Sequence, residues 1–244
     1  MKRVKESSKV AMLIAMFAIT FTSTAFAQEK GTFTDPRDKK KYSTVKIGEQ
    51  TWMAENLSYN AKGSKCYDKD PANCTKYGKL YDWATAMGLA STCNVNICVK
   101  QIKAKHTGIC PKGWYLPSDK DWDKLYRFAD STSGAESPYR SETAGKYLKS
   151  KEGWKDDYKG KSGNGEDKFG FSALPGGTSY YSVGRGGGSG GENFDYVGRR
   201  GYWWSSSESE YAGASSFSRF MEEDKASYTS ANKDGFYSVR CMQD

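Results

Sequence analysis

Residues 110–122 read Cys-Pro-Lys-Gly-Trp-Tyr-Leu-Pro-Ser-Asp-Lys-Asp-Trp, and the end of this stretch has the features of a helix start. Ser118 can accept hydrogen bonds from the first free backbone N–H groups, and Asp121 stands three residues later, where a capping-box acid belongs. The residues that follow repeat at helical spacing along one apolar face, formed by Trp122, Leu125, Tyr126 and Ala129. The pattern predicts a helix that begins after Ser118 and buries one side.

Weaker helical patterns and several strand-like segments surround this helix. Apolar residues at helical spacing predict a helix over 79–88 that ends at Gly88, and a shorter one is expected over 142–149. Residues 31–59 alternate short β-branched and aromatic runs with Pro, Gly and Asp, which is typical of a strand meander. Residues 202–205 and 236–241 also have strand character. These patterns together predict an α+β fold.

The first 27 residues have the composition of a secretory signal peptide. A basic segment precedes an uncharged run over residues 10–27, which closes on Ala25-Phe26-Ala27, so cleavage is expected before Gln28. An uncleaved membrane anchor is the alternative interpretation. We therefore expect a secreted, periplasmic or cell-surface protein with a single domain over residues 28–244, no linker after residue 31 and no membrane span after cleavage.

All six cysteines follow the predicted signal peptide: Cys66, Cys74, Cys93, Cys98, Cys110 and Cys241. An even number in an exported chain indicates disulfides rather than a zinc site, since no Cys-x-x-Cys motif occurs. Six cysteines allow 15 pairings. Their spacing favours two short loops, closed within the first four cysteines, and leaves the last two for a bridge from mid-chain to the C-terminal end. The pairing itself stays open at this point.

Composition and charge exclude several classes of function. The 37% hydrophobic and 14% aromatic content argues against a disordered chain. The net charge of +8 is spread out, and the densest basic runs, residues 39–41 and 100–105, lack the interleaved aromatics of a nucleic-acid groove. His106 is the only histidine, so a three-His metal site cannot form and a Ser-His-Asp triad has one candidate base. No nucleic-acid partner is expected.

Several ordered stretches together resemble one family. They are residues 31–38 with 45–57, then 110–118, then 170–177, and finally Gly-Tyr-Trp-Trp-Ser-Ser-Ser-Glu at 201–208 closing on Gly-Phe-Tyr-Ser-Val-Arg-Cys at 235–241. The chain resembles the Fibrobacter succinogenes major paralogous domain, an exported bacterial family of unassigned activity. The resemblance extends over essentially the whole predicted mature chain.

A more distant resemblance concerns the fold. Residues 116–122 before a helix, a late Trp-rich strand and the aromatic-Ser-Val-Arg ending are similar to the formylglycine-generating-enzyme group of the C-type lectin-like fold. That resemblance implies small twisted antiparallel sheets with two to three flanking helices and chain ends held together, which suits a Cys110–Cys241 bridge. Its copper chemistry is not implied, because every cysteine has a plausible disulfide partner. The Glu-Pro-Asn, Gln-Pro-Asp and Trp-Asn-Asp motifs of calcium-dependent lectins are absent.

The segment 205–234 is the first candidate for a ligand surface, because this part of a C-type lectin-like chain commonly forms the exposed face. Aromatic side chains among polar neighbours can stack on sugar rings or contact a protein. The candidates are Trp203, Trp204, Tyr211, Phe217, Arg219 and Tyr228. Adjacent tryptophans on a strand should face opposite sides, so one of the two is expected to face solvent. For Phe217 and Tyr228 a position in the sheet core is the open alternative. Residues 184–191, nearly all glycine, predict an exposed, mobile loop, which is a further candidate for contact with the partner.

Two further patterns suggest other chemistry. Asn164, Glu166 and Asp167 form an oxygen-rich loop among glycines, which can bind Ca²⁺, although Asp turns bonded to their own backbone have the same composition. Two carboxylates are enough for glycoside hydrolysis, and the candidates are Glu208, Glu210, Glu222, Glu223 and Asp224. Acidic runs of this kind are also typical of a solvated face.

These observations favour a non-catalytic binding or cell-surface interaction module for an extracellular polysaccharide or a protein. Apart from the calcium hypothesis, no cofactor is expected. A two-carboxylate hydrolase and a structural component of the cell envelope are the alternatives that the sequence leaves open.

Overall fold

The computed structural model describes residues 28–130, 140–182, 190–209 and 213–244. The predicted signal peptide, most of the glycine-rich loop, Glu210 and Tyr211 lie outside these ranges. No helix in the described part is both long enough and apolar enough to cross a membrane.

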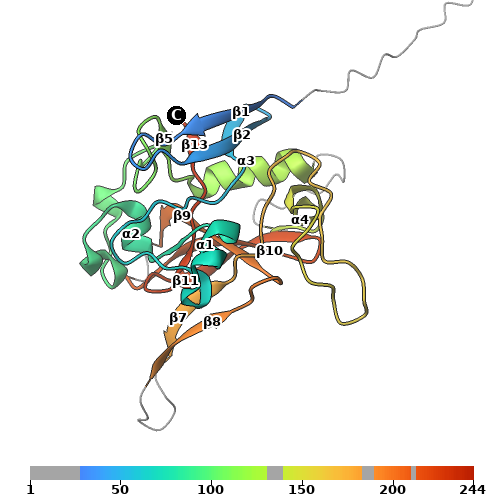
Figure 1. Cartoon of the computed structure of the whole chain (residues 1–244). Coiled ribbons are helices and arrows are strands. Elements are labelled where there is room, and N and C mark those ends of the chain that lie inside the picture. Colours follow the sequence, from blue (N-terminus) through green and yellow to red (C-terminus); the bar gives the residue numbers. More distant parts are fainter. Residues whose placement is uncertain (1–27, 131–139, 183–189, 210–212) are drawn as a thin grey trace, which may run out of the picture.

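The described residues form four short helices and three antiparallel or mixed sheets, so the α+β prediction is confirmed (Figure 1). The helices are α1 (Pro71–Tyr77), α2 (Trp83–Met87), α3 (Asp119–Asp130) and α4 (Ala144–Leu148), with the 3-10 turns η1 (Tyr67–Lys69), η2 (Ser91–Asn94) and η3 (Val99–Gln101). The strands are β1 (Lys30–Thr34), β2 (Lys41–Ile47), β3 (Gln50–Met53), β4 (Leu80–Tyr81), β5 (Trp114–Tyr115), β6 (Arg140–Ser141), β7 (Thr178–Ser182), β8 (Gly191–Asp195), β9 (Gly201–Glu208), β10 (Ser215–Glu222), β11 (Lys225–Asn232), β12 (Tyr237–Ser238) and β13 (Met242–Gln243).

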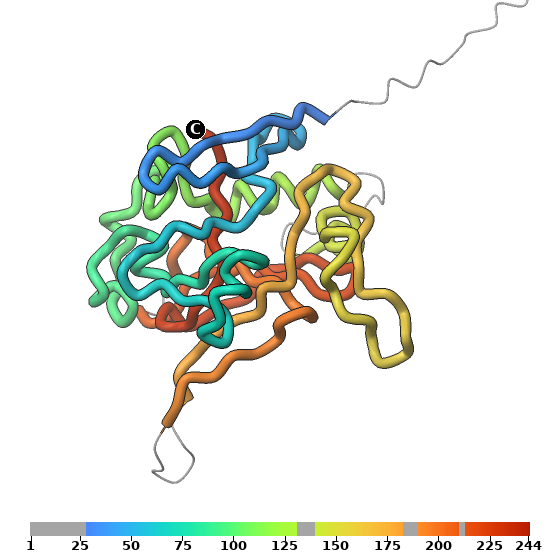
Figure 2. The backbone as a smooth tube through the Cα atoms, viewed as in Figure 1, coloured from blue at the N-terminus to red at the C-terminus, as the bar shows by residue number. Residues whose placement is uncertain are grey.

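The predicted meander forms most of the first sheet, in the order β1-β2-β3-β13-β5. The C-terminal strand β13 lies between β3 and β5, which it pairs with antiparallel. Figure 2 shows how the last segment of the chain crosses the molecule to reach the N-terminal strands. The two ends of the described chain are thus held together through backbone pairing.

Helix α3 begins where the capping pattern predicts. Ser118 Oγ donates to Asp121 Oδ2 at 2.6 Å, and the same carboxylate oxygen accepts from the backbone N–H of Ser118 at 2.8 Å. All four residues of the predicted apolar face are buried. Packing of that face against the sheets removes it from water and stabilises the helix, which at this length would be only marginally stable alone.

The other helical predictions need adjustment. Helix α2 ends at Gly88 as expected, but it begins after Asp82, whose side chain accepts from the Thr85 N–H at 2.9 Å. Leu80 and Tyr81 are instead paired with β12 as strand β4. Helix α1 was not predicted, although Asp70 caps it and Pro71 occupies its first position, which are ordinary start signals.

The second sheet has the order β4-β12-β9-β10-β11-β6, and β7 and β8 form a separate two-stranded hairpin. The stretch between the strand-like flanks contains the two long strands β10 and β11, paired from Ser215↔Asn232 to Glu222↔Lys225. The strand pattern was hard to see in the sequence because serines occupy buried as well as partly buried positions of β10, and β11 buries only Ala226 and Ala231. In Figure 1 the β7–β8 hairpin extends away from the body of the molecule.

The expectation that one of two adjacent tryptophans faces solvent is wrong. Trp203 and Trp204 do point to opposite faces of β9, but both are fully buried, because β9 is an inner strand with both faces covered. Trp203 packs against Trp122 of α3, while Trp204 packs against Tyr237. Each indole N–H has an acceptor, Asn56 Oδ1 and the Tyr81 carbonyl respectively. The pair therefore joins two hydrophobic cores, and neither residue can be a sugar platform.

The disulfide pairing favoured by spacing is confirmed. Bridges join Cys66 to Cys74, Cys93 to Cys98, and Cys110 to Cys241. The third closes a sequence separation of 131 residues between the segment before β5 and the segment before β13. A bridge over so long a loop removes the most conformational freedom from the unfolded chain.

Candidate functional site

Arg219, one of the predicted binding residues, is part of the core instead. Its guanidinium is 1% exposed and forms ion pairs with Asp119 at 2.9 Å and Asp123 at 2.8 Å, both on α3. Burial is the largest influence on Asp123, and it raises the pKa of that carboxyl despite the neighbouring guanidinium. The ion pairs fasten β10 to α3, so Arg219 is not available to a ligand.

Phe217 and Tyr228 divide between the two alternatives, because Phe217 is partly buried in the sheet whereas Tyr228 is exposed. Their rings contact each other across the β10–β11 pair at 6.0 Å. Phe217 is partly buried, and Tyr228 is 36% exposed with the Arg219 guanidinium 5.7 Å from its ring. They form a small aromatic contact on the face of the sheet toward Arg219.

Tyrosines from other segments meet in an open groove of about 410 Å³, which we call the tyrosine groove. Its lining includes residues 229–232 of β11 and the turn at Asp234 and Gly235. The tyrosines that line it are Tyr180, Tyr181, Tyr196, Tyr202 and Tyr237. Three of them are well exposed, Tyr180 by 38%, Tyr181 by 65% and Tyr196 by 43%. The groove therefore presents rigid aromatic area bordered by hydroxyl and amide groups.

The β7–β8 hairpin is fixed beside the second sheet by backbone contacts at its base. Ser179 and Phe236 exchange backbone hydrogen bonds, and Thr178 Oγ1 donates to the Phe236 carbonyl at 3.1 Å. Gly177 precedes the hairpin with φ +67°, and a Cβ there would lie 2.5 Å from the Asp195 carbonyl oxygen. Only glycine fits this close approach, and it fixes the position of Tyr180 and Tyr181 of β7 relative to β12.

A partly buried ionic contact holds the second strand of the same hairpin, β8, to the body of the molecule. Glu192 pairs with Lys65 and, at 3.1 Å, with Lys69. Burial opposes ionisation of Glu192, but the hydrogen bonds from the two lysines outweigh it and lower the pKa of the carboxyl. The Lys65 ammonium also lies 3.5 Å from the Phe236 ring centre. The hairpin is thus held to the body through charge as well as backbone pairing.

The floor of the groove is a stacked pair of tyrosines. Tyr202 and Tyr237 lie 5.2 Å apart at 19°, and Tyr196 contacts Tyr202 at 6.1 Å. Burial raises the pKa of Tyr237 to about 12 and raises that of Tyr202 as well, so both are neutral at physiological pH. The hydrogen bond that Tyr180 donates to Asp195 at 2.7 Å raises the pKa of Tyr180 too. A neutral aromatic surface suits an uncharged ligand.

Tyr196 is held in an unusual backbone conformation, with φ +67°. This left-handed region disfavours a bulky side chain and is more often seen in glycine or asparagine. The backbone N–H groups of Arg199 and Arg200 both donate to the Tyr196 carbonyl at 2.9 Å, and the Arg200 guanidinium lies 4.5 Å from its ring. Strain of this kind is frequent at functional sites, and here it places an exposed ring at the groove edge.

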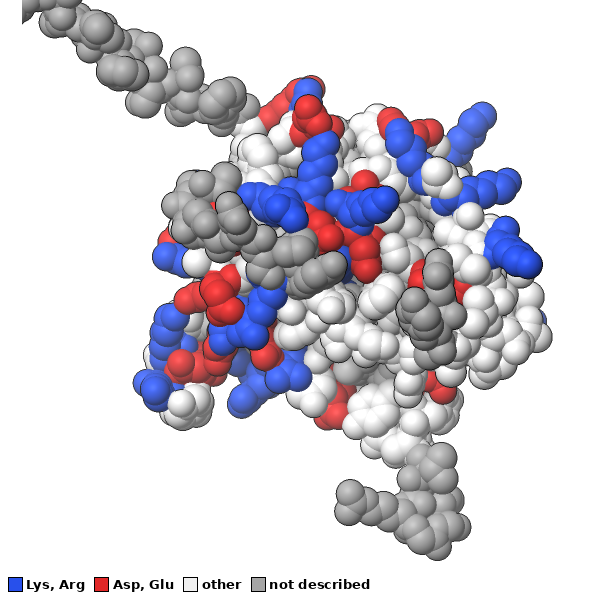
Figure 3. Space-filling view, turned by 180° about the vertical axis from the view of Figure 1, so that it is seen from behind, with Lys and Arg blue, Asp and Glu red and all other residues white. Residues whose placement is uncertain are grey.

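A second, larger hollow of about 680 Å³ is lined by charged side chains of both signs. Of the five candidate acids, Glu222, Glu223 and Asp224 line this charged cleft, whereas Glu208 is buried elsewhere in an ion pair with Lys233. Within the cleft, Asp224 pairs with Lys161 at 2.7 Å and Glu222 pairs with Arg200. Figure 3 shows blue and red side chains interspersed on the left of that view, the side of the 150–170 segment.

The predicted calcium loop is occupied by protein contacts. Asn164 Oδ1 accepts from the Trp154 N–H at 3.0 Å, the Asp167 carboxylate accepts from the Ser172 N–H and hydroxyl, and Glu166 pairs with Lys146. Among the residues that the structure describes, no group of three or more His, Cys, Asp and Glu side chains could hold a metal ion. Calcium binding here stays a prediction.

Sequence reasoning missed the five groove tyrosines but named the β11 segment that lines one side. A local signal existed for two of them, since Tyr180 and Tyr181 directly precede the glycine-rich stretch. The others follow β8 or lie in β9 and β12, and they meet the first two because β7 pairs with β8 and the chain around its start forms bridges to the segments at Gly201 and Phe236.

The chain matches a family model described as the Fibrobacter succinogenes major domain over residues 45–243. No curated protein and no solved structure matches it. The match covers the first sheet from the middle of β2 onward, the charged cleft and the tyrosine groove. The chain therefore belongs to the Fibrobacter succinogenes major domain family.

Proposed function

We propose that this protein is a non-catalytic, exported binding module whose tyrosine groove takes an extracellular polysaccharide. The observation that supports this most directly is the gathering of three exposed tyrosines over a stacked, neutral tyrosine pair. Sugar rings present apolar C–H faces that pack on aromatic rings, while their hydroxyls exchange hydrogen bonds with Ser, Thr and Asn side chains. Residues 229–232 offer such groups at the groove wall.

The binding test uses insoluble cellulose, xylan and chitin, with depletion of the protein from solution and release of sugar measured together. We expect depletion on at least one polysaccharide without sugar release. At roughly 1 kcal/mol or more for each stacked ring lost, the double variant Tyr180→Ala/Tyr181→Ala should weaken binding at least tenfold and the single variant Tyr196→Ala at least about fivefold.

The control variant is Tyr158→Ala, which removes the most exposed aromatic side chain elsewhere, 86% exposed. Its binding should equal that of the unaltered protein. Equal binding by the groove variants would overturn the assignment of the site, and no depletion on any polysaccharide would favour a protein ligand or a structural role in the envelope. Repeating the assay with a chelator tests the calcium prediction at Asn164, Glu166 and Asp167.

The second candidate is a two-carboxylate glycoside hydrolase, favoured by the acids of the charged cleft. The ionisation of these acids argues against it, because Glu222 and Asp224 form ion pairs with basic residues. In the same cleft, hydrogen bonds from backbone N–H groups, that of Lys161 first, lower the pKa of Asp157. A general acid requires a raised pKa. Sugar release that is abolished by Glu223→Gln would support this candidate over the binding module.

We also propose that the architecture is C-type lectin-like. The pairing of β13 between β3 and β5 and the Cys110–Cys241 bridge support it, since both hold the chain ends together. An experimental structure of the protein would test this arrangement directly.

A further inference from the structure

In the part of the chain that the structure describes, the large aliphatic side chains that are exposed lie in one short loop. Val95 is 65% exposed, Ile97 49% and Val99 37%, and every other large hydrophobic residue that is exposed in the described part of the chain is aromatic. We call residues 95–99 the apolar loop. Single exposed leucines or valines need no explanation, but three within five residues concentrate exposed apolar area in one short loop.

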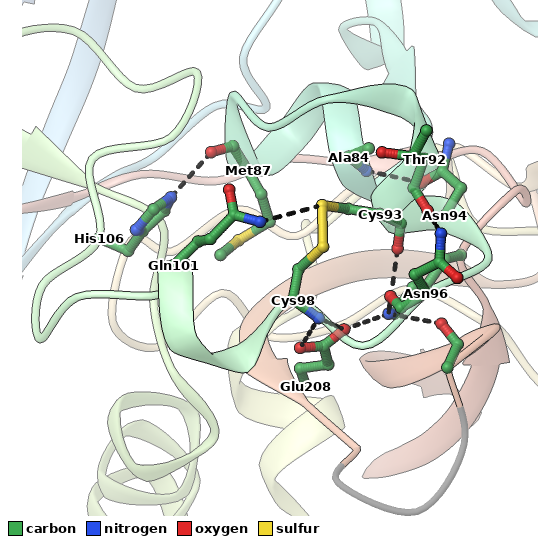
Figure 4. Close-up of a disulfide and its surroundings, with 12 residues drawn as sticks. Ala84, Met87, Thr92, Cys93, Asn94, Asn96, Cys98, Gln101, His106 and Glu208 are labelled. Atoms are coloured by element: carbon green, nitrogen blue, oxygen red, sulfur yellow. Dashed lines mark hydrogen bonds and ion pairs between the residues drawn. A yellow bond between two sulfur atoms is a disulfide. The ribbon is translucent and has the colours of Figure 1, made fainter.

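The apolar loop is held rigidly from below (Figure 4). The Cys93–Cys98 disulfide closes it, and both carboxylate oxygens of Glu208 accept from the Cys98 N–H, at 2.9 and 2.8 Å. The Lys233 ammonium pairs with Glu208 and donates to the carbonyls of Cys93 at 3.1 Å and Asn96 at 3.0 Å. The backbone that carries the three side chains is thus already fixed, so the loop would lose little conformational entropy on binding.

The surroundings of the loop are basic. Residues 83–118 contain four lysines and no aspartate or glutamate. The four are all exposed: Lys100, Lys103, Lys105 and Lys112. Among these, Lys105 pairs with Asp244 at 2.8 Å. In Figure 3 the right-hand side of the molecule has a broad white area, and the side chains above it are mostly blue with some red among them. The loop therefore combines exposed apolar side chains with exposed lysines in the same segment, while the carboxylate beneath it, that of Glu208, is buried and paired with Lys233.

We propose that the apolar loop inserts into the headgroup region of an anionic phospholipid bilayer, with the flanking lysines at its surface. Apolar side chains gain by leaving water at the interface, and each nearby lysine gains from the negative surface potential. A stable protein interface needs about 800 Å² on each partner, which three aliphatic side chains cannot supply. This contact is separate from the tyrosine groove and would hold an exported protein at a membrane surface while the groove remains open.

The first test is flotation with lipid vesicles made of phosphatidylcholine alone or of an equal mixture with phosphatidylglycerol. The protein is collected as exported, with its N-terminus defined by mass spectrometry, and the same preparation serves for every variant. We expect binding to the mixed vesicles that is at least tenfold stronger than to phosphatidylcholine and that weakens as salt is raised.

Three variants separate the contributions. Val95→Ser/Ile97→Ser/Val99→Ser should weaken binding to the mixed vesicles at least tenfold, and Lys100→Gln/Lys103→Gln should weaken it by about fivefold per lysine. The control Tyr158→Ser, on a well-exposed residue elsewhere, should bind as the unaltered protein does. Thermal unfolding of each variant checks that the fold is intact.

A second measurement locates the loop and does not depend on loss of binding. In Ile97→Trp, the added fluorescence should be quenched by brominated phospholipid in mixed vesicles, whereas that of Tyr158→Trp should not. No binding to the mixed vesicles would overturn the proposal and favour an acidic protein partner. Binding that persists in the triple serine variant, or an unquenched signal from the indole added in Ile97→Trp, would show surface attraction alone and would overturn insertion.

Discussion

The two ends of the β10–β11 hairpin lie near two buried lysines with opposite environments. At the open end, Lys233 is fully buried and its ammonium contacts the Glu208 carboxylate and three backbone carbonyls, of Cys93, Asn96 and Gly213. Near the turn at residues 222–225, Lys149 is 1% exposed and donates to the Gly163 carbonyl, with no ion-pair partner in the described part of the chain.

The two lysines differ in how many partners replace the water that each ammonium loses on burial. Burial lowers the pKa of Lys149 to about 8, because one carbonyl and the Trp154 ring do not replace the lost water. Lys233 has a carboxylate and enough carbonyls to satisfy its three donors. The first end is therefore fixed by a complete ionic cluster, while the second contains a charge that the fold tolerates.

The largest effect is expected from removing the carboxylate at the first end. Glu208→Gln leaves the Lys233 ammonium buried without an opposite charge, which should lower the free energy of unfolding by about 3–5 kcal/mol. Urea denaturation with the disulfides intact measures it. In the double variant Glu208→Gln/Lys233→Met the buried charge is gone, so part of this loss should be recovered. A Glu208→Gln variant as stable as the unaltered protein would contradict the ionic cluster.

A second prediction concerns pH and the other lysine. The pKa of Lys149 is about 8 in the folded protein and near 10.5 when unfolded, so between these values the unfolded chain binds more protons. Stability should therefore rise with pH across this window, by roughly 2 kcal/mol relative to Lys149→Met. Denaturation of both proteins from pH 7.5 to 10.5 measures the difference. Parallel pH profiles would mean that Lys149 is not buried as a cation.

The smallest effect is expected from the charges around Lys149. Asp224 favours the charged ammonium, so Asp224→Asn should lower the pKa of Lys149 further. The same change removes the exposed Lys161 ion pair, which should cost at most about 0.5 kcal/mol. An NMR titration of the lysine side chains measures the midpoint, with Asp157→Asn as a control. An upward shift of the Lys149 midpoint would contradict this electrostatic account.

Local features of the fold were predictable because neighbouring residues determine them. The Ser118–Asp121 cap, the buried face of α3 and the short disulfide loops depend on contacts within a few residues, and all three are confirmed. The start of α2 was misplaced because Leu80 and Tyr81 pair with β12, a strand far along the chain. A distant pairing can override a local helical pattern.

The candidate site was less predictable for the same reason. Alternation along β9 correctly placed Trp203 and Trp204 on opposite faces, but exposure depends on what covers each face, and that comes from α3 on one side and from the segment around Tyr237 on the other. Arg219 was predicted to lie at the surface because its sequence neighbours do not show that Asp119 and Asp123 of α3 pair with its guanidinium.

The sequence by itself determined the α+β class, the family resemblance, the preferred disulfide pairing and the main helix, because periodicity, caps and spacing act over short distances. Only the tertiary structure decided which tyrosines meet in the groove, which lysine has a carboxylate, and that the apolar loop stands on a fixed base. These outcomes depend on contacts between different segments, as in those of Glu208 with Lys233, 25 residues away, and with Cys98, 110 residues away. Such contacts form only when the whole chain has folded.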